Sequence, residues 1–340
     1  MRRRLPHKWR IADDSPLESR DGPLGPRLAD HVGMHESLIL TRSLRAAGET
    51  TLGVERGARS GRFVRVRPGA YIPTVEWQRM SAELRHRVAM DALAATSRRP
   101  VVFAVESAAA LLGIPLVGGW PTLPRVAVGL RPPRRSRVDV SMRWRPVPTG
   151  DVVSVSEMLA TCPARTAIDL AAERDLASGV AAFDHVMRVH GQTRDAIRSR
   201  IDADRPFRGA RKADAALALA TGRAEGPFES LSLTRIHQLG FEAPEQQVEF
   251  VIDGIRYRCD FYWPRLRLIG EADGRSKYGD FPGEALWLEK QREDALRSVV
   301  DGLVRWGWAD AWAGHPLALR LERAGLHADP RIASKYAFSS

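Results

Sequence analysis

The segment from residue 255 to 273 constrains the fold of this chain more than any other. Apolar residues alternate with polar ones on both sides of Pro264-Arg265, which predicts two β-strands joined by a turn. One face of the first strand is expected to carry Ile255, Tyr257, Cys259, Phe261 and Trp263, and one face of the second Leu266, Leu268, Gly270 and Ala272. An antiparallel strand pair is therefore expected here.

Three acidic residues occupy the other positions of these strands. A tight turn places Asp260 opposite Glu271, with Asp273 one pleat further on. Facing carboxylates destabilise a sheet unless a proton or a cation lies between them. Asp260, Glu271 and Asp273 are thus predicted to bind a hard divalent metal, Mg²⁺ or Mn²⁺. The alternative is that they are solvated residues on an open sheet face.

A fourth acid lies on a predicted helix from Pro227 to Gln238. Glu229 shares a helical stripe with Leu233 and Ile236, so it borders the apolar face of that helix. A half-buried carboxylate needs a partner, and we expect Glu229 to support the acidic cluster.

Charge and cysteine content narrow the class of protein. The net charge of +11 and the pI near 10.4 favour a polyanionic partner, with nucleic acid as the leading candidate, although an Arg-rich proteome would give the same balance. Cys162 and Cys259 are the only cysteines, which suits a reducing cytoplasm. The basic N-terminus lacks the apolar core of a secretory signal, and no membrane-spanning run is expected.

The pattern changes at Met34. Residues 1–33 are rich in Pro, Gly and charge, which predicts a flexible basic arm or an extension upstream of the true start. Residues 34–75 predict a helix over 37–47, a second helix ending at Ser60, and a hairpin over 63–72. Helix, turn, helix and hairpin in this order predict a winged helix-turn-helix that binds DNA.

Arginine dominates this predicted module. Residues 34–74 hold seven arginines against three glutamates, a net charge of +4. Arg56 and Arg59 lie on the second helix, and Arg65 and Arg67 are expected to point away from the apolar face of the wing. Together with Arg62 they are the predicted DNA-binding residues. The alternative is a small helical module with a solvated basic face.

The rest of the chain predicts two larger parts and a connection. Residues 76–200 mix helices with short strands, 201–225 are expected to form a linker, and 226–340 form the last domain. The fold class is therefore mixed α/β and multidomain.

The last domain resembles a known superfamily. Glu229 on a helix, a hairpin, Asp260 and then Glu271-Ala272-Asp273-Gly274 are similar in order and spacing to the PD-(D/E)XK nucleases, especially the very-short-patch-repair endonuclease-like branch. The resemblance implies a Mg²⁺-dependent phosphodiesterase fold with Asp260 and Glu271 as metal ligands. The superfamily has Lys where this chain has Asp273, and Lys277 and Lys290 are the candidates to supply the missing charge. The alternative is that both are surface lysines.

The upstream part resembles the AbiEi-type antitoxins. The similar segments are 44–48, 61–71, 106–115 and 163–170. This resemblance implies DNA binding and transcriptional control, with a toxin as an unidentified partner. Two hypotheses follow: a cytoplasmic Mg²⁺-dependent DNA endonuclease with a winged-helix module, or a DNA-binding regulator whose nuclease fold is weak or inactive. An RNA-acting enzyme fits the charge but lacks an aromatic stacking motif.

Overall fold

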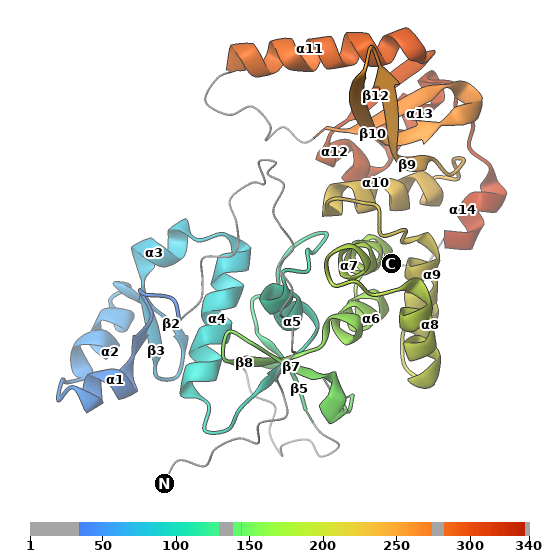
Figure 1. Cartoon of the computed structure of the whole chain (residues 1–340). Coiled ribbons are helices and arrows are strands. Elements are labelled where there is room, and N and C mark those ends of the chain that lie inside the picture. Colours follow the sequence, from blue (N-terminus) through green and yellow to red (C-terminus); the bar gives the residue numbers. More distant parts are fainter. Residues whose placement is uncertain (1–33, 129–138, 144, 274–281, 337–340) are drawn as a thin grey trace. The chain divides into compact units, whose positions relative to one another are not determined.

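The computed structural model describes residues 34–128, 139–143, 145–273 and 282–336 (Figure 1). Two compact units are present. The first comprises residues up to Gly113 and Gly119–Thr166, and the second comprises Ile114–Gly118 and the chain from Ala167 onward. The fold is mixed α/β with several domains, as predicted. The predicted arm, 1–33, lies outside the described residues.

The first unit begins with a small helix-and-hairpin module. Its elements are β1 (Ile39–Leu40), α1 (Thr41–Ala46), α2 (Leu52–Arg59), β2 (Phe63–Arg67), β3 (Ala70–Pro73) and α3 (Thr74–Arg79). The strands form an antiparallel sheet in the order β1-β3-β2. Gly69, at a φ of +86°, closes the predicted turn between β2 and β3. The first helix starts later than predicted, because Ile39 and Leu40 pair with β3 instead.

The helix α4 (Ala82–Thr96) completes the core of this module. Ser81 caps it by accepting a hydrogen bond from the Leu84 amide. Val88 and Ala92 on α4 pack with Leu40 and Ile72 from the sheet. By contrast, Gly57 is the only buried residue of α1 and α2. These two helices therefore keep most of their surface exposed.

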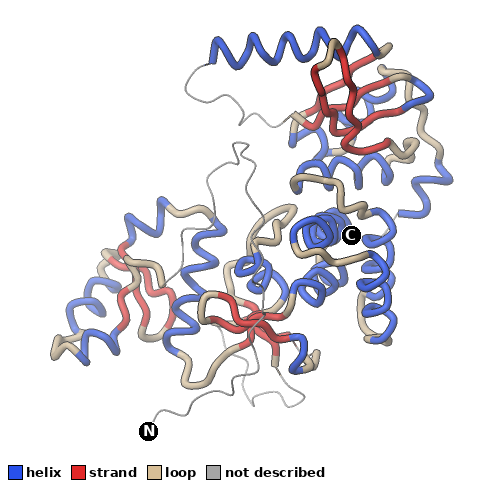
Figure 2. The backbone as a smooth tube through the Cα atoms, in the orientation of Figure 1, coloured by secondary structure: helices blue, strands red, loops and turns tan. Residues whose placement is uncertain are grey.

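A five-stranded mixed sheet forms the rest of the first unit (Figure 2). Its strands, in the order β6-β5-β4-β8-β7, are β4 (Val102–Phe103), β5 (Arg125–Ala127), β6 (Ser141–Arg143), β7 (Val152–Val155) and β8 (Met158–Thr161). The short helix α5 (Val105–Leu112) ends at Gly113, whose φ is +70°. Phe103, Ala110 and Val126 share a core with Met90 and Leu93, which lie on another side of α4.

Helices dominate the start of the second unit. They are α6 (Pro163–Glu173), whose first turn belongs to the first unit, α7 (Leu176–Val189), α8 (Arg194–Ala203), α9 (Ala210–Leu219) and α10 (Pro227–Gln238). Residues 201–225, which are expected to form a linker, contain a helix in the structure. This helix is α9, where Ala213, Ala216 and Leu217 are fully buried. The unit boundary also falls near Thr166, inside the predicted middle domain.

The second unit ends in a four-stranded mixed sheet in the order β12-β11-β10-β9. Its elements are β9 (Glu245–Ile252), β10 (Ile255–Trp263), β11 (Leu268–Ala272), α11 (Pro282–Val299), β12 (Gly302–Trp306), α12 (Trp308–Ala313), α13 (His315–Arg323) and α14 (Pro330–Tyr336). Figure 1 shows α10 and α11 on opposite sides of this sheet. The predicted strand–turn–strand is confirmed: β10 and β11 pair antiparallel, with Trp263 opposite Leu268.

The predicted face of β10 is wrong in one respect. Phe261 and Trp263 pack in the core with α10, whereas Tyr257 and Cys259 pack in the core that holds Leu296 of α11. The strand changes face near Asp260. In the neighbouring strand β9, Gln247 has a φ of +55°, which breaks the regular pleat at this level. No helix in the described part of the chain combines the length and apolar character that a bilayer crossing requires.

Candidate functional site

Four of the five predicted DNA-binding arginines are exposed. Arg56 and Arg59 lie three residues apart on α2, which places them on neighbouring turns of one side of the helix. Arg62 follows this helix, and Arg65 lies on β2. The Arg62 guanidinium lies 5.4 Å from the centre of the Phe63 ring. The exposed arginines thus surround a short helix and the hairpin that follows it.

The fifth arginine has a different environment. The register of β2 shifts between Arg65 and Arg67, so these two side chains do not point the same way. Arg67 forms an ion pair of 3.0 Å with Asp139, and only 9% of its side chain is exposed. Its geometry therefore indicates a structural role in the first unit.

Close packing fixes the position of α2 on the hairpin. A Cβ atom added at Gly57 would lie 2.6 Å from Cδ2 of Phe63. Only glycine permits the helix to approach the ring this closely. The helix that carries Arg56 and Arg59 is thus seated directly against β2, which carries Arg65.

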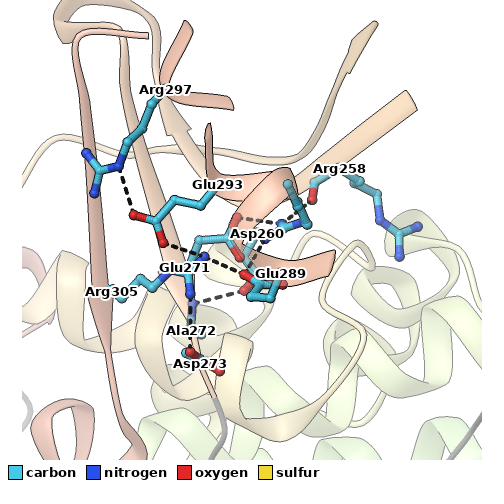
Figure 3. Close-up of polar contacts among 10 residues, drawn as sticks. Arg258, Asp260, Glu271, Ala272, Asp273, Glu289, Glu293, Arg297 and Arg305 are labelled. Carbon is cyan, nitrogen blue, oxygen red and sulfur yellow. Dashed lines mark hydrogen bonds and ion pairs between the residues drawn. The ribbon is translucent and has the colours of Figure 1, made fainter. Parts of the chain in front are cut away.

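The second predicted site lies on β10 and β11. Phe261 pairs with Gly270, so the next residues along the two strands are Asp260 and Glu271, as the sequence predicts. The Ala272 amide donates a hydrogen bond of 2.9 Å to Oδ2 of Asp260. Glu271 is 8% exposed, and Figure 3 shows its carboxylate beside that of Asp260. The expected pair of facing carboxylates is present.

Glu229 lies on α10, and its carboxyl is close enough to Asp260 to be affected by that charge. Burial raises the pKa of the Glu229 carboxyl to about 7, and the negative charge of Asp260 adds to this rise. Glu229 Oε2 accepts hydrogen bonds from the Glu225 amide, at 3.0 Å, and from Gln247 Nε2, at 2.8 Å. The acid therefore has donors of its own and ties α10 to β9.

Glu271 is the most buried acid of the cluster. Burial raises the pKa of its carboxyl to about 7, Arg292 on α11 opposes this rise, and Asp260 adds to it. The pKa of Arg292 is raised as well, by Glu271 acting against the effect of burial. The two partners thus give opposite indications: Arg292 is held in its charged form, whereas burial drives Glu271 toward its protonated form.

Asp273 contacts other residues than Asp260 and Glu271 do. Its amide donates to the carbonyl of Trp306, and its Oδ2 lies 3.7 Å from Nη1 of Arg305 on β12. Arg305 also pairs with Glu289 and Glu293 of α11 (Figure 3). Lys277 lies outside the described residues, and Lys290 is exposed. The lysine position of the nuclease motif is thus not filled by a described lysine.

The residues as arranged do not fit the divalent metal that the nuclease resemblance implies. Asp260 accepts a backbone amide, Glu271 pairs with Arg292, and Asp273 pairs with Arg305. Within the described ranges, no three His, Cys, Asp or Glu side chains are grouped to hold a metal ion. Glu271 and Asp273 are paired with guanidinium groups, and binding of a cation by them would require these contacts to break.

Sequence reasoning missed Arg292 and Arg305. A weak indication existed in α11, where Arg292 follows Glu289 by three residues and thus shares a helix face with it. Arg305 lies directly beside Glu271 across the parallel ladder of β11 and β12. This pairing depends on the order of strands in the sheet, which the sequence pattern does not specify.

Comparisons with known proteins identify one segment. Residues 87–219 match the family model described as AbiEi antitoxin C-terminal domain. The matched range extends from the middle of α4 to the end of α9, and it includes two of the segments that carry the antitoxin resemblance, 106–115 and 163–170. The α1–β3 module and the sheet that holds Asp260 and Glu271 lie outside this match.

Uncharacterized proteins of two Mycobacterium tuberculosis strains, MT2308 and Rv2248, are 34% identical to the chain over 118 residues. The match covers 34% of this chain and 44% of each relative, less than half of its length. The crystal structure of the RV2827C protein from the same species is 16% identical, with a TM-score of 0.35. That similarity covers 53% of this chain and 71% of the other.

Proposed function

We propose that this chain is a DNA-binding regulator of the antitoxin type that contacts DNA through α2 and the β2–β3 hairpin. The observation that carries this proposal is the set of exposed arginines, Arg56, Arg59, Arg62 and Arg65, on these adjoining elements. Exposed guanidinium groups bind backbone phosphates, and a helix seated on a hairpin fits the major groove with the hairpin beside it. The net charge of +11 supports the same partner.

The match over residues 87–219 supports the antitoxin part of the proposal. The name of the matched family, an antitoxin, points to a toxin protein as a partner. We therefore propose a protein toxin as a second partner, recognised by a region other than α2 and the hairpin.

Fluorescence anisotropy with a duplex from the chain's own promoter region tests the DNA contact. We expect Arg56→Ala and Arg65→Ala each to weaken binding several-fold, because each removes a phosphate contact. Arg211→Ala is the matched control, since Arg211 is exposed on α9 and its loss changes the net charge equally. Equal losses in all three variants would show that binding depends only on total charge.

Mg²⁺-dependent cleavage of DNA is a second candidate function. The facing of Asp260 and Glu271, with Glu229 nearby, favours it, whereas the ion pair between Glu271 and Arg292 opposes it. Cleavage would require Arg292 to release Glu271, so that the Glu271 carboxylate could bind a cation. Incubation with supercoiled, linear and mismatched DNA plus Mg²⁺ or Mn²⁺ is the test. Any cutting that survives Asp260→Ala would not come from these acids.

A further inference from the structure

Arg292 joins three elements around the buried acids. From α11, its Nη2 lies 2.8 Å from Oε1 of Glu271 on β11 and donates at 2.9 Å to the carbonyl of Arg258 on β10. Its Nη1 lies 3.2 Å from Oε1 of Glu289. One guanidinium therefore binds two strands and its own helix at once, which its planar set of five donors permits.

A second arginine extends this network. Glu289 accepts from Arg305 as well as from Arg292, and Arg305 also contacts Asp273 and Glu293. Glu293 in turn pairs with Arg297 at 2.8 Å. Acidic and basic groups thus alternate across α11, β11 and β12, as Figure 3 shows for Glu271, Glu289, Glu293 and Arg305.

Cations and guanidinium groups compete for the same carboxylate oxygens. A divalent cation at Glu271 would need the oxygen that Arg292 holds, and it would lie a few ångströms from a fixed positive charge. Like charges at such a distance repel strongly in a partly buried site. Displaced from Glu271, Arg292 would also have to give up or rebuild its contacts with Glu289 and the Arg258 carbonyl.

We propose that Arg292 is a built-in counter-ion that takes the place of a divalent metal beside Asp260 and Glu271. The guanidinium holds the acids together and excludes a metal, so the domain keeps a nuclease-like arrangement of acids without depending on Mg²⁺. This inference is independent of DNA binding by α2 and the hairpin.

Isothermal titration of the full chain with MnCl₂ and MgCl₂ tests it. We expect the wild type to bind neither metal specifically, and Arg292→Ala to bind Mn²⁺ at least about tenfold more tightly than the wild type does, because Glu271 loses its guanidinium partner. Adding Glu271→Gln to Arg292→Ala should abolish the gain. Arg292→Lys keeps a cation next to Glu271 and should exclude Mn²⁺ as the wild type does.

Two outcomes overturn the proposal. One is Mn²⁺ binding by the wild type that Glu271→Gln abolishes, since the metal would then coexist with Arg292. The other is a folded Arg292→Ala variant with no gain in Mn²⁺ affinity. If Arg292→Ala does not fold, thermal unfolding of the wild type and of Arg292→Lys decides: we expect Mn²⁺ to leave both midpoints unchanged, and an upward shift that Glu271→Gln removes would refute the proposal.

Discussion

Asp184 offers a sharp test of how the second unit is held together. The residue lies on α7 and is 1% exposed. Its Oδ1 accepts hydrogen bonds from the amides of Thr221, at 2.8 Å, and Gly222, at 2.7 Å, and its Oδ2 accepts one from Oγ of Ser230, at 2.7 Å. Burial raises the pKa of this carboxyl, and the three donors partly offset the effect. One carboxylate thus fixes the segment that connects α9 to α10.

Asp184→Ala leaves two partly buried amides and a buried hydroxyl without this acceptor. Each unsatisfied group costs about 1–3 kcal/mol, and the two amides are only partly buried, so we expect a loss in the lower part of the summed range, roughly 3–5 kcal/mol, in the free energy of unfolding. Asp184→Asn keeps an acceptor for the two amides and removes a buried charge, so its free energy of unfolding should fall by only about 1 kcal/mol. Ser230→Ala removes one hydrogen bond and should cost about 1–2 kcal/mol.

Urea unfolding followed by tryptophan fluorescence measures these differences, because Trp263 and Trp306 are buried in the same unit. Comparison at equal urea concentration removes the error of long extrapolation. An Asp184→Ala midpoint equal to that of the wild type would refute the reasoning. It would show that the Asp184 carboxylate does not anchor the connection between α9 and α10.

Three further predictions follow from packing, titration and charge. Gly270→Ala places a Cβ atom 2.7 Å from Trp306 and 2.8 Å from Trp263, so we expect roughly 1–3 kcal/mol of destabilisation. The urea midpoint should fall accordingly, and an unchanged midpoint would contradict this close packing. Burial, with the charges of His190 and Arg188, lowers the pKa of His185 to about 4. The stability that its neutral form contributes is therefore present above about pH 6.5 and is lost as the pH falls toward 4. In His185→Gln the thermal midpoint should depend less on pH between these values. Arg67→Ala should lower the thermal midpoint of the first unit because it leaves Asp139 without this ion pair, whereas Arg65→Ala should leave that midpoint unchanged, as calorimetry can show.

The strand pair could be predicted because the residues that specify it lie close together in the sequence. Alternating apolar residues around Pro264 specify the register, which places Asp260 beside Glu271. The change of face in β10 depends instead on Gln247 in the neighbouring strand β9, which has a left-handed backbone conformation. The residues of β10 themselves do not predict this conformation. The arginine partners of the acids were missed for a similar reason, since the order of the strands places Arg305 beside Glu271 and the packing of α11 on the sheet places Arg292 there.

The helix α9 was missed because its packing uses small side chains. A Cβ added at Gly179 on α7 would lie 2.9 Å from Ala171 of α6 and 2.9 Å from Ala216 of α9. Three helices therefore approach closely through glycine and alanine, which give little apolar periodicity. Residues 201–225 consequently resembled a polar, Ala-rich linker, although Leu217 and Ala213 are fully buried.

The salt dependence of DNA affinity tests the central proposal most directly. The slope of log K against log salt concentration counts the phosphates that a protein neutralises, at about 0.9 per phosphate. For a variant with Arg56, Arg59, Arg62 and Arg65 all changed to Ala, we expect the slope to become shallower by about 2–4, with Arg211→Ala and Asp260→Ala retaining the wild-type slope. A four-arginine variant that keeps both the wild-type affinity and the wild-type slope would contradict DNA binding through α2 and the hairpin.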